Sequence, residues 1–422
     1  MIGLIDCNNF FVSCERVFNP SLQNEPVIVL SNNDGCVVSL SNEAKVLNIK
    51  RGVPLSQIQS IVDKNGVRVY SSNYKLYGDM STRVMSTLMT IIPNIEIYSI
   101  DEAFIDLSDI PTSKIEDICR SIVRKIRRHT GIPTSLGVAP TKTLAKIASK
   151  IAKCDAKNNG VFIISEDNRI DILKNTSIDA IWGIGKQLCQ RLYRIGISNA
   201  FTFIQNPPLS YADILNIQGI KIWHELNGKP SIDLEGADID RKQLCSSRTF
   251  SVPLTSIDEL YSAISMFVEN ICNKLVKQNS SAVSINVFLY SGEKNNTLDY
   301  AKNSYYKFEE PTYDIVTITK IALSQVKTLF KVGLEYKKAG IIIPEIIKTN
   351  EIQPCLFSNH QLRKKHSLLM DTLANINKNE RTKDQVHLAT ISSQRNLVKN
   401  EYQSPLYTTA FDDIIKINKT LY

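Results

Sequence analysis

The stretch IEIYSIDEAFIDL at residues 95–107 places two adjacent carboxylates, Asp101 and Glu102, in the middle of an apolar, strand-forming run. Burying two anions in such a run is costly unless a cation compensates them. A third carboxylate, Asp6, ends a similar apolar strand at the start of the chain. Together with the carbonyl oxygen of Cys7, these groups could hold a pair of Mg²⁺ ions and a substrate's phosphates. The spacing alone fits equally well a hairpin turn at a solvent-exposed sheet edge.

Chain length, composition and charge limit the number of domains and the class of binding partner. A chain of 422 residues with 43% hydrophobic residues is expected to form two to four domains. Residues 1–138 balance their acidic and basic side chains, so the net charge of +8 arises after residue 138. This asymmetry favours a catalytic region followed by a polyanion-binding region, although solubility alone would also account for it.

The cysteine pattern and the hydropathy of the chain indicate the cellular compartment in which it folds. The nine cysteines are scattered without a C-x-x-C pair, which argues against a disulfide framework or a zinc site and for a reducing compartment. We find no leader pattern and no apolar run long enough to cross a bilayer. The sequence therefore predicts a cytoplasmic protein without a membrane partner.

The order of predicted elements indicates several domains. Strands and helices alternate over residues 1–165, including a helix capped by Ser41 and another closed by Gly131, which predicts an α+β sheet covered on one face. Residues 168–236 predict only short helices, residues 241–345 return to a β-α-β pattern, and the polar tail after 346 is expected to be loosely ordered.

The segment IWGIGKQLCQRLYRIGI at 181–197 has the plan of a helix-hairpin-helix. Gly183 and Gly185 would permit close backbone approach to a phosphate, and Lys186 adds a positive charge there. A plain interhelical turn is the alternative interpretation.

Six segments of the chain together are far more specific than any single motif. They are VLSNNDGCVVSLSNEAKVLNIKRG at 29–52, SSNYKLYGDMSTRVMSTL at 71–88, SIDEAF at 99–104, TKTLAKIASKIAK at 141–153, DAIWGIGKQL at 179–188 and SPLYTTAFDDI at 404–414. In this order, they resemble the Y-family translesion DNA polymerases of the UmuC type, the catalytic subunit of bacterial DNA polymerase V and its plasmid-borne relatives. The resemblance covers essentially the whole chain.

The resemblance implies an α+β multidomain fold, a right-hand polymerase. It assigns residues 1–20 and 70–165 to the palm, 21–69 to small fingers, 166–236 to an all-α helix-hairpin-helix thumb and 241–345 to a β-α-β little finger. Residues 346–422 would form a C-terminal tail with a clamp-binding peptide. The implied function is error-prone, template-directed translesion DNA synthesis by two-metal nucleotidyl transfer, in damage-induced SOS mutagenesis and DNA repair, without a proofreading exonuclease.

The resemblance also implies residue roles. Asp6, Asp101 and Glu102 would be the catalytic metal ligands, with Glu102 nearest the primer hydroxyl, and Phe11 would be the steric gate that excludes a 2′-hydroxyl. Asn42 stands where other branches carry Tyr, which makes it a doubtful contact. The remaining assignments are nucleotide contacts at Phe10, Ser39, Lys45 and Lys153, DNA contacts at Gly183, Gly185, Lys186 and Arg248, and a clamp peptide at Gln353, Leu356 and Phe357.

The implied partners are primer-template DNA, dNTPs, a UmuD-like dimer, a RecA filament and the β sliding clamp, all in the bacterial nucleoid. Three alternatives remain open. They are a palm-domain nucleotidyl cyclase, a non-catalytic DNA-binding subunit, and a DinB-like polymerase that acts as a single chain.

Overall fold

The computed structural model describes residues 1–154, 158–211, 213–236, 240–294, 297–298, 300–353, 368–370, 372–373, 376–377, 386–391 and 399–414. The chain divides into two compact units. The first comprises Met1–Ile239 and Asn400–Tyr422, and the second comprises Asp240–Lys399.

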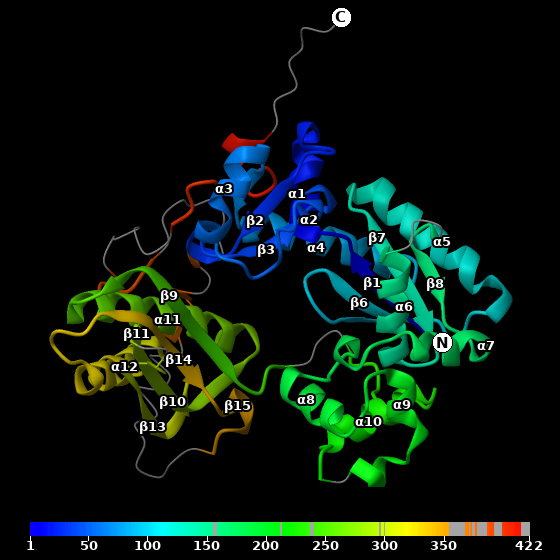
Figure 1. Ribbon diagram of the computed structural model, residues 1–422. Helices are drawn as coiled ribbons and strands as arrows, with labels where there is room; N and C mark the ends of the chain where they lie inside the picture. Colours follow the sequence, from blue (N-terminus) through cyan, green and yellow to red (C-terminus); the bar gives the residue numbers. More distant parts are fainter. Residues whose placement is uncertain are drawn as a thin grey trace, which may run out of the picture. The chain divides into compact units, whose positions relative to one another are not determined.

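The first unit is built around a five-stranded sheet in the order β5-β6-β1-β7-β8 (Figure 1). The central strand, β1, pairs antiparallel with both β6 and β7, and β7 pairs parallel with β8. The strands are β1 (Ile2–Cys7), β5 (Ile95–Ile97), β6 (Glu102–Asp106), β7 (Thr134–Ala139) and β8 (Val161–Ile163).

Helices cover both faces of this sheet, so the expectation of a sheet covered on one face is wrong. Ile5 and Ile105 pack on one side in a core with α1 (Phe10–Phe18), α4 (Tyr74–Met89) and α5 (Thr112–Thr130). Leu4 and Phe104 point to the other side and pack against α6 (Lys142–Cys154). The alternation of side chains along β1 requires this arrangement, because both its odd and its even positions are apolar.

A smaller sheet follows α1, with the order β3-β2-β4 and its own apolar core. Its strands are β2 (Val27–Leu30), β3 (Val37–Leu40) and β4 (Arg68–Ser71), and its helices are α2 (Asn42–Val46) and α3 (Leu55–Asn65). The predicted cap of α2 is confirmed, since the Ser41 hydroxyl accepts a hydrogen bond from the Ala44 amide at 3.2 Å.

The next part of the first unit is helical, as predicted, with α7 (Glu166–Lys174), α8 (Lys186–Arg194), α9 (Ala200–Gln205) and α10 (Ile217–Leu226). The helix expected before the Gly-x-Gly hairpin is reduced to a 3₁₀ turn at Ile178–Ala180. The core of these helices is continuous with that of α6.

The second unit is a sheet in the order β13-β10-β14-β9, with α11 and α12 packed in one core against it. The sequence did not predict β13. The bounds are β9 (Leu244–Leu254), α11 (Ile257–Lys277), β10 (Ser280–Ser291), β11 (Glu293–Lys294), β12 (Thr297–Leu298), β13 (Ala301–Thr312), α12 (Ile315–Leu329), β14 (Tyr336–Ile343) and β15 (Ile346–Lys348).

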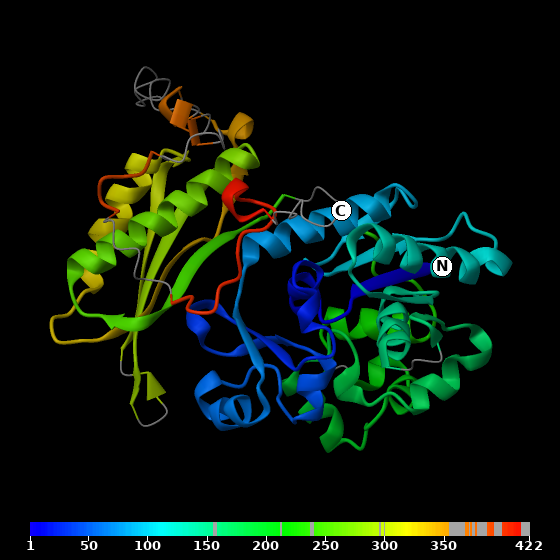
Figure 2. The same cartoon turned by 90° about the horizontal axis from the view of Figure 1, so that it is seen from above.

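Part of the tail is ordered against the first unit, contrary to the expectation of a loose tail. The Ser71 amide donates to the Tyr402 carbonyl at 3.0 Å, and the Tyr407 ring stacks on Phe18 with centroids 4.9 Å apart. Figure 2 shows this red segment passing beside the start of α4. None of the described helices combines the length and apolar character needed to cross a bilayer.

Candidate metal and phosphate site

The three predicted carboxylates meet at one end of the first sheet. Asp6 lies directly opposite Glu102 in the β1–β6 ladder, and the Cys7 amide donates to the Asp101 carbonyl at 2.8 Å. Side chains opposite each other in an antiparallel ladder share a face, so Asp6 and Glu102 project to the side covered by α6. The register therefore brings together residues that are 96 positions apart.

Two lysines of α6 hold two of these carboxylates. Lys153 Nζ lies 2.6 Å from Asp6 Oδ1, and Lys146 Nζ lies 2.9 Å from Glu102 Oε2. The two lysines are seven residues, or about two helical turns, apart, so they share one face of the helix. Helix α6 reaches the carboxylates because it crosses β7 closely at Gly137, where a Cβ would lie only 1.9 Å from the Ser149 backbone nitrogen.

Asp101 is oriented by its own turn. The Ser99 hydroxyl donates to Asp101 Oδ1 at 2.7 Å and accepts from the Glu102 amide at 3.0 Å. This local bonding fixes the turn between β5 and β6, so the hairpin and the carboxylate cluster are one feature and the two interpretations of the sequence are compatible.

Burial raises the pKa of the Asp6 carboxyl, while Lys153 opposes that rise and the neighbouring Glu102 and Asp101 add to it. The arrangement thus carries more negative charge than the buried setting favours. A divalent cation would relieve that cost.

The donor set fits a hard cation. Carboxylate oxygens and a backbone carbonyl are the ligands that Mg²⁺ prefers. Within the described ranges, no three His, Cys, Asp or Glu side chains are already gathered around a point that could hold a metal. Lys153 and Lys146 each pair with one of the carboxylates.

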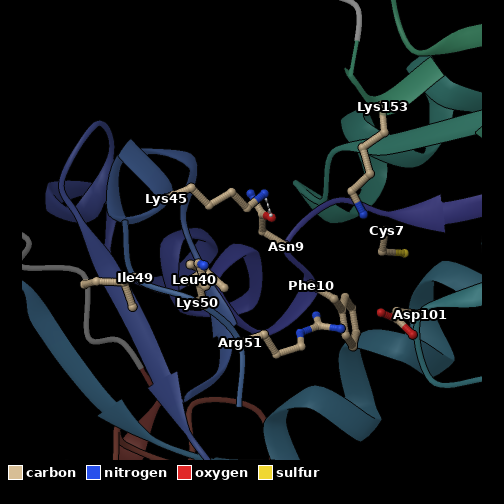
Figure 3. Close-up of a pocket in the computed structure, with 10 residues that line it drawn as sticks. All are labelled: Cys7, Asn9, Phe10, Leu40, Lys45, Ile49, Lys50, Arg51, Asp101 and Lys153. Atoms are coloured by element: carbon tan, nitrogen blue, oxygen red, sulfur yellow. Dashed lines mark hydrogen bonds between the residues drawn. The ribbon is translucent and has the colours of Figure 1, made fainter. Parts of the chain in front are cut away.

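A pocket of about 380 Å³ lies beside the carboxylates (Figure 3). Its lining brings together basic side chains from residues 45–51 and from α6, and Asp101 also lines it. Such a cluster of positive charges is suited to binding a polyphosphate. The lining residues are Cys7, Asn9, Phe10, Leu40, Lys45, Ile49, Lys50, Arg51, Asp101 and Lys153.

Lys45 is held in place by amides. Its Nζ donates to Asn9 Oδ1 at 3.0 Å and to Asn42 Oδ1 at 2.9 Å, and Figure 3 shows the Asn9 contact. Asn9 has a positive φ of 47° at the start of α1, a conformation that asparagine tolerates well. Asn42, which the sequence left doubtful as a nucleotide contact, therefore positions Lys45. Burial, aided by Lys153, lowers the pKa of Lys45.

The aromatic pair divides between two environments. Phe10 lines the pocket, whereas Phe11 stacks on the Tyr77 ring of α4 with centroids 4.4 Å apart and ring planes at 12°. Ser39 is buried beside pocket-lining Leu40, and its hydroxyl has no hydrogen-bond partner among the described residues. An unsatisfied buried hydroxyl of this kind would gain from a ligand oxygen.

The backbone of the predicted helix-hairpin-helix is compatible with phosphate binding. Gly183 has a positive φ of 85°, and a Cβ there would meet the Ile222 side chain at 2.7 Å. Gly185 precedes α8, whose first turn has no side-chain cap. Lys186 is exposed at this end, so free amides and a positive charge face outward together.

The other predicted contacts lie in the second unit. Arg248 is half-buried and lies on the same face of β9 as the core residues Leu244 and Phe250, on the helix-covered side of the sheet. Burial lowers the pKa of Arg248. Gln353 is exposed. Leu356 and Phe357 lie outside the described residues.

The sequence interpretation missed three basic residues of the site: Lys50, Arg51 and Lys146. Lys50 and Arg51 reach the pocket because the following turn bonds to β3, with the Gly52 amide donating to the Val37 carbonyl at 2.7 Å. The Lys-Arg pair before a glycine was the available signal. Lys146 also lies over the Tyr98 ring at 4.2 Å, a contact that spacing could not predict.

Comparisons with known proteins show the family of the chain. The profile of the impB/mucB/samB family matches residues 5–150, and that of the family's C-terminal domain matches residues 241–355. Protein ImpB of Salmonella typhimurium is 34% identical over 98% of this chain and 99% of its own length. Protein UmuC of Salmonella typhimurium strain LT2 is 32% identical over 99% of this chain and 100% of its own.

Among solved structures, a Y-family DNA polymerase chimera of Dbh and Dpo4 is similar to this chain, with a TM-score of 0.68 and 22% identity. The match covers 82% of this chain and 100% of the chimera. The expectation of an α+β polymerase fold is thereby confirmed.

Proposed function

The chain belongs to the impB/mucB/samB family of UmuC-type Y-family DNA polymerases, and from this premise we propose which of its residues perform the reaction. Its activity is DNA-directed DNA synthesis of the error-prone translesion class. The observation that carries the site assignment is the apposition of Asp6 and Glu102 at neighbouring strand ends, beside a pocket rich in cations.

Asp6, Asp101, Glu102 and the Cys7 carbonyl would hold two Mg²⁺ ions. When bound, such ions activate the primer 3′-hydroxyl and neutralise charge on the triphosphate. The Ser99 hydroxyl keeps Asp101 in its orientation. Lys45, Lys50, Arg51 and Lys153 bind and orient the phosphates, and Lys153 is already within reach of the carboxylates.

We assign sugar selection to Phe11, as the steric gate, and support of the nucleotide to Phe10. The placement of Phe10 in the pocket and of Phe11 beside it on α1 supports this division. Fidelity would rest mainly on base pairing. The part of the chain that carries Lys45, on α2 beside the three-stranded sheet, is small and can close only to a limited extent over the nascent base pair.

We propose the division into palm (1–20 and 70–165), fingers (21–69), thumb (166–236), little finger (241–345) and tail. The separate apolar core formed by residues between 28 and 69 and the strand-free helical part after 165 support it. The hairpin at Gly183 and Gly185, with Lys186, would hold duplex phosphates without reading sequence, and the second unit would add further phosphate contacts.

The finer partners and setting are also proposals. We propose that a UmuD-like dimer and a RecA filament activate the chain on the bacterial nucleoid, and that Gln353, Leu356 and Phe357 dock on the β sliding clamp. The full-length similarity to a UmuC protein supports the first two partners. Synthesis across an abasic site, with and without each partner, distinguishes this model from a polymerase that acts as a single chain.

Substitution of Asp101 tests the metal assignment. Asp101→Asn is expected to lower primer extension by at least about a thousandfold, or ~4 kcal/mol of transition-state stabilisation, because it removes a charged ligand. DNA affinity, measured by fluorescence anisotropy, should stay near that of the wild type. Asp109→Asn, at an exposed carboxylate of the same region, is the matched control. Extension by Asp101→Asn at the level of the control would refute the assignment.

A further inference from the structure

A buried carboxylate that the proposed reaction does not use lies behind the gate. Glu15 is only 1% exposed and lies four residues after Phe11, so both side chains project from one face of α1. Its Oε1 accepts hydrogen bonds from the Tyr77 hydroxyl at 2.7 Å and from the Ser404 hydroxyl at 3.0 Å. Within the described part of the chain, these hydroxyls, rather than a cation, satisfy the carboxylate.

The same tyrosine supports the gate. The buried Tyr77 ring stacks on Phe11 with centroids 4.4 Å apart, and Tyr74 meets the Phe11 ring edge-on at 6.0 Å. Because the Tyr77 hydroxyl is tied to Glu15, rotation of the tyrosine ring would break a hydrogen bond to a buried carboxylate. The position of Phe11 is therefore coupled to the hydrogen bonds of Glu15.

The Ser404 hydroxyl comes from the docked segment, residues 401–407, which is anchored at several points. Asn73 Nδ2 donates to Ser404 Oγ at 3.0 Å and to the Pro405 carbonyl at 3.1 Å, while Asn73 Oδ1 caps α4 at the Leu76 amide. The Glu401 amide donates to Asp34 Oδ2 at 2.8 Å. Tyr407 covers Phe18 at the other end of α1.

These contacts form one continuous path from the docked segment to the gate. We infer that the docked segment positions the steric gate: Ser404, acting through Glu15 and Tyr77, holds the Phe11 ring where it excludes a 2′-hydroxyl. Glu15, Tyr77 and Ser404 are thus positioning residues for sugar selection. The inference rests on the proposed function of Phe11.

Ser404→Ala in the full-length chain tests the inference. The ratio of kcat/KM for a dNTP to that for the matching rNTP is expected to fall about five- to tenfold, the size that loss of one hydrogen bond to a charged group permits. The change should come from faster ribonucleotide incorporation. Ser404→Thr, which keeps the hydroxyl, should retain the wild-type ratio. Thr409→Ala removes an exposed hydroxyl of the same tail and serves as the control.

Tyr77→Phe provides a second test that does not depend on tail docking. It keeps the ring that stacks on Phe11 and removes only the hydroxyl that reaches Glu15, so the ratio should fall as in Ser404→Ala. A merely structural role would slow both nucleotides equally and leave the ratio unchanged in both variants, which would overturn the inference.

Phe11→Ala separates this inference from the gate assignment. If Phe11→Ala lowers the ratio and Ser404→Ala adds nothing to it in the double variant, the coupling is supported. If Phe11→Ala lowers the ratio but Ser404→Ala and Tyr77→Phe do not, only the positioning inference fails. If Phe11→Ala leaves the ratio unchanged, the gate assignment fails and the inference falls with it.

Discussion

Gly137 is the point at which the fold allows α6 to reach the carboxylates, and Gly137→Ala is its most direct test. A Cβ at this position would lie 1.9 Å from the Ser149 nitrogen, 2.4 Å from the Ala148 carbonyl carbon and 2.6 Å from the Ser149 Cα. All three are backbone atoms, so no side-chain rotation relieves the clash. Ordinary contact would require α6 to retreat by about 1.5 Å or more.

Two effects are expected from this displacement. Overpacking of a tight core costs ~1–3 kcal/mol, and the upper end applies here because the strain falls on backbone. The same shift carries Lys146 and Lys153 away from Glu102 and Asp6, and a displacement of this size can lower the rate up to about a hundredfold.

Tryptophan fluorescence is a suitable probe of this stability. The chain has two tryptophans, Trp182 and Trp223, and both lie in the first unit. Denaturant unfolding followed by their emission therefore reports on the unit that contains Gly137. We expect the midpoint to fall for Gly137→Ala, and kcat in primer extension to fall with it.

Gly78→Ala is the matched control. Gly78 lies inside α4, and nothing lies within 4 Å of its Cβ position. Alanine there should stabilise the unit by ~0.5–1 kcal/mol, since it only lowers the entropy cost of the helix. An unfolding free energy for Gly137→Ala within ~0.5 kcal/mol of the wild type would refute the close-packing argument.

Two further predictions concern the pocket and the tail. Arg51→Ala should raise KM for the incoming dNTP about tenfold without changing DNA affinity, because a charged hydrogen bond to phosphate contributes ~1.5–3 kcal/mol. Single-nucleotide incorporation kinetics would check this, with Arg68→Ala as a control at an exposed arginine. A KM for Arg51→Ala equal to that of the wild type and the control would exclude Arg51 from the phosphate site. Replacing Leu356 and Phe357 together by Ala should abolish the stimulation of synthesis by the sliding clamp but preserve basal synthesis. Clamp stimulation that persists in a primer-extension assay of this variant would contradict the assignment of these residues to clamp docking.

Much of the fold was predictable because its signals are local. The helix closed by Gly131 is confirmed, with Gly131 in the left-handed region at a φ of 75°. The apolar run at 95–107 forms β5 and β6, with Asp101 in the turn between them and Glu102 as the first residue of β6. Each of these depends on apolar periodicity or on a turn residue.

Two elements were missed for different reasons. β13 is rich in lysine, asparagine, tyrosine and glutamate and lies at the edge of its sheet, so few of its side chains are buried and it shows no apolar alternation. α3 does carry an apolar face, because Leu55, Ile58, Ile61 and Val62 recur with helical spacing and pack against the core of the smaller sheet. That helix was therefore predictable from its periodicity.

Site residues were predictable where chemistry and strand position coincide, as for Asp6 and Glu102. The ion pairs of Lys146 with Glu102 and of Lys153 with Asp6 were not predictable, although Lys153 itself was expected as a nucleotide contact, because these pairs depend on the angle at which α6 crosses β7. The docked segment was missed for a related reason. It is held by hydrogen bonds and one aromatic stack, and these leave no periodic pattern in the sequence.

The contact between Glu15 and Ser404 joins positions 389 residues apart, with the whole second unit between them in the chain. During synthesis, the gate helix α1 is thus complete long before its last hydrogen-bond donor leaves the ribosome. A protease cut between residues 354 and 398 would leave the residues of the gate untouched. It would nevertheless convert the docked segment into a separate peptide, which would lose the high effective concentration that tethering provides. Nicked polymerase could therefore remain active while its preference for deoxyribose declines on dilution.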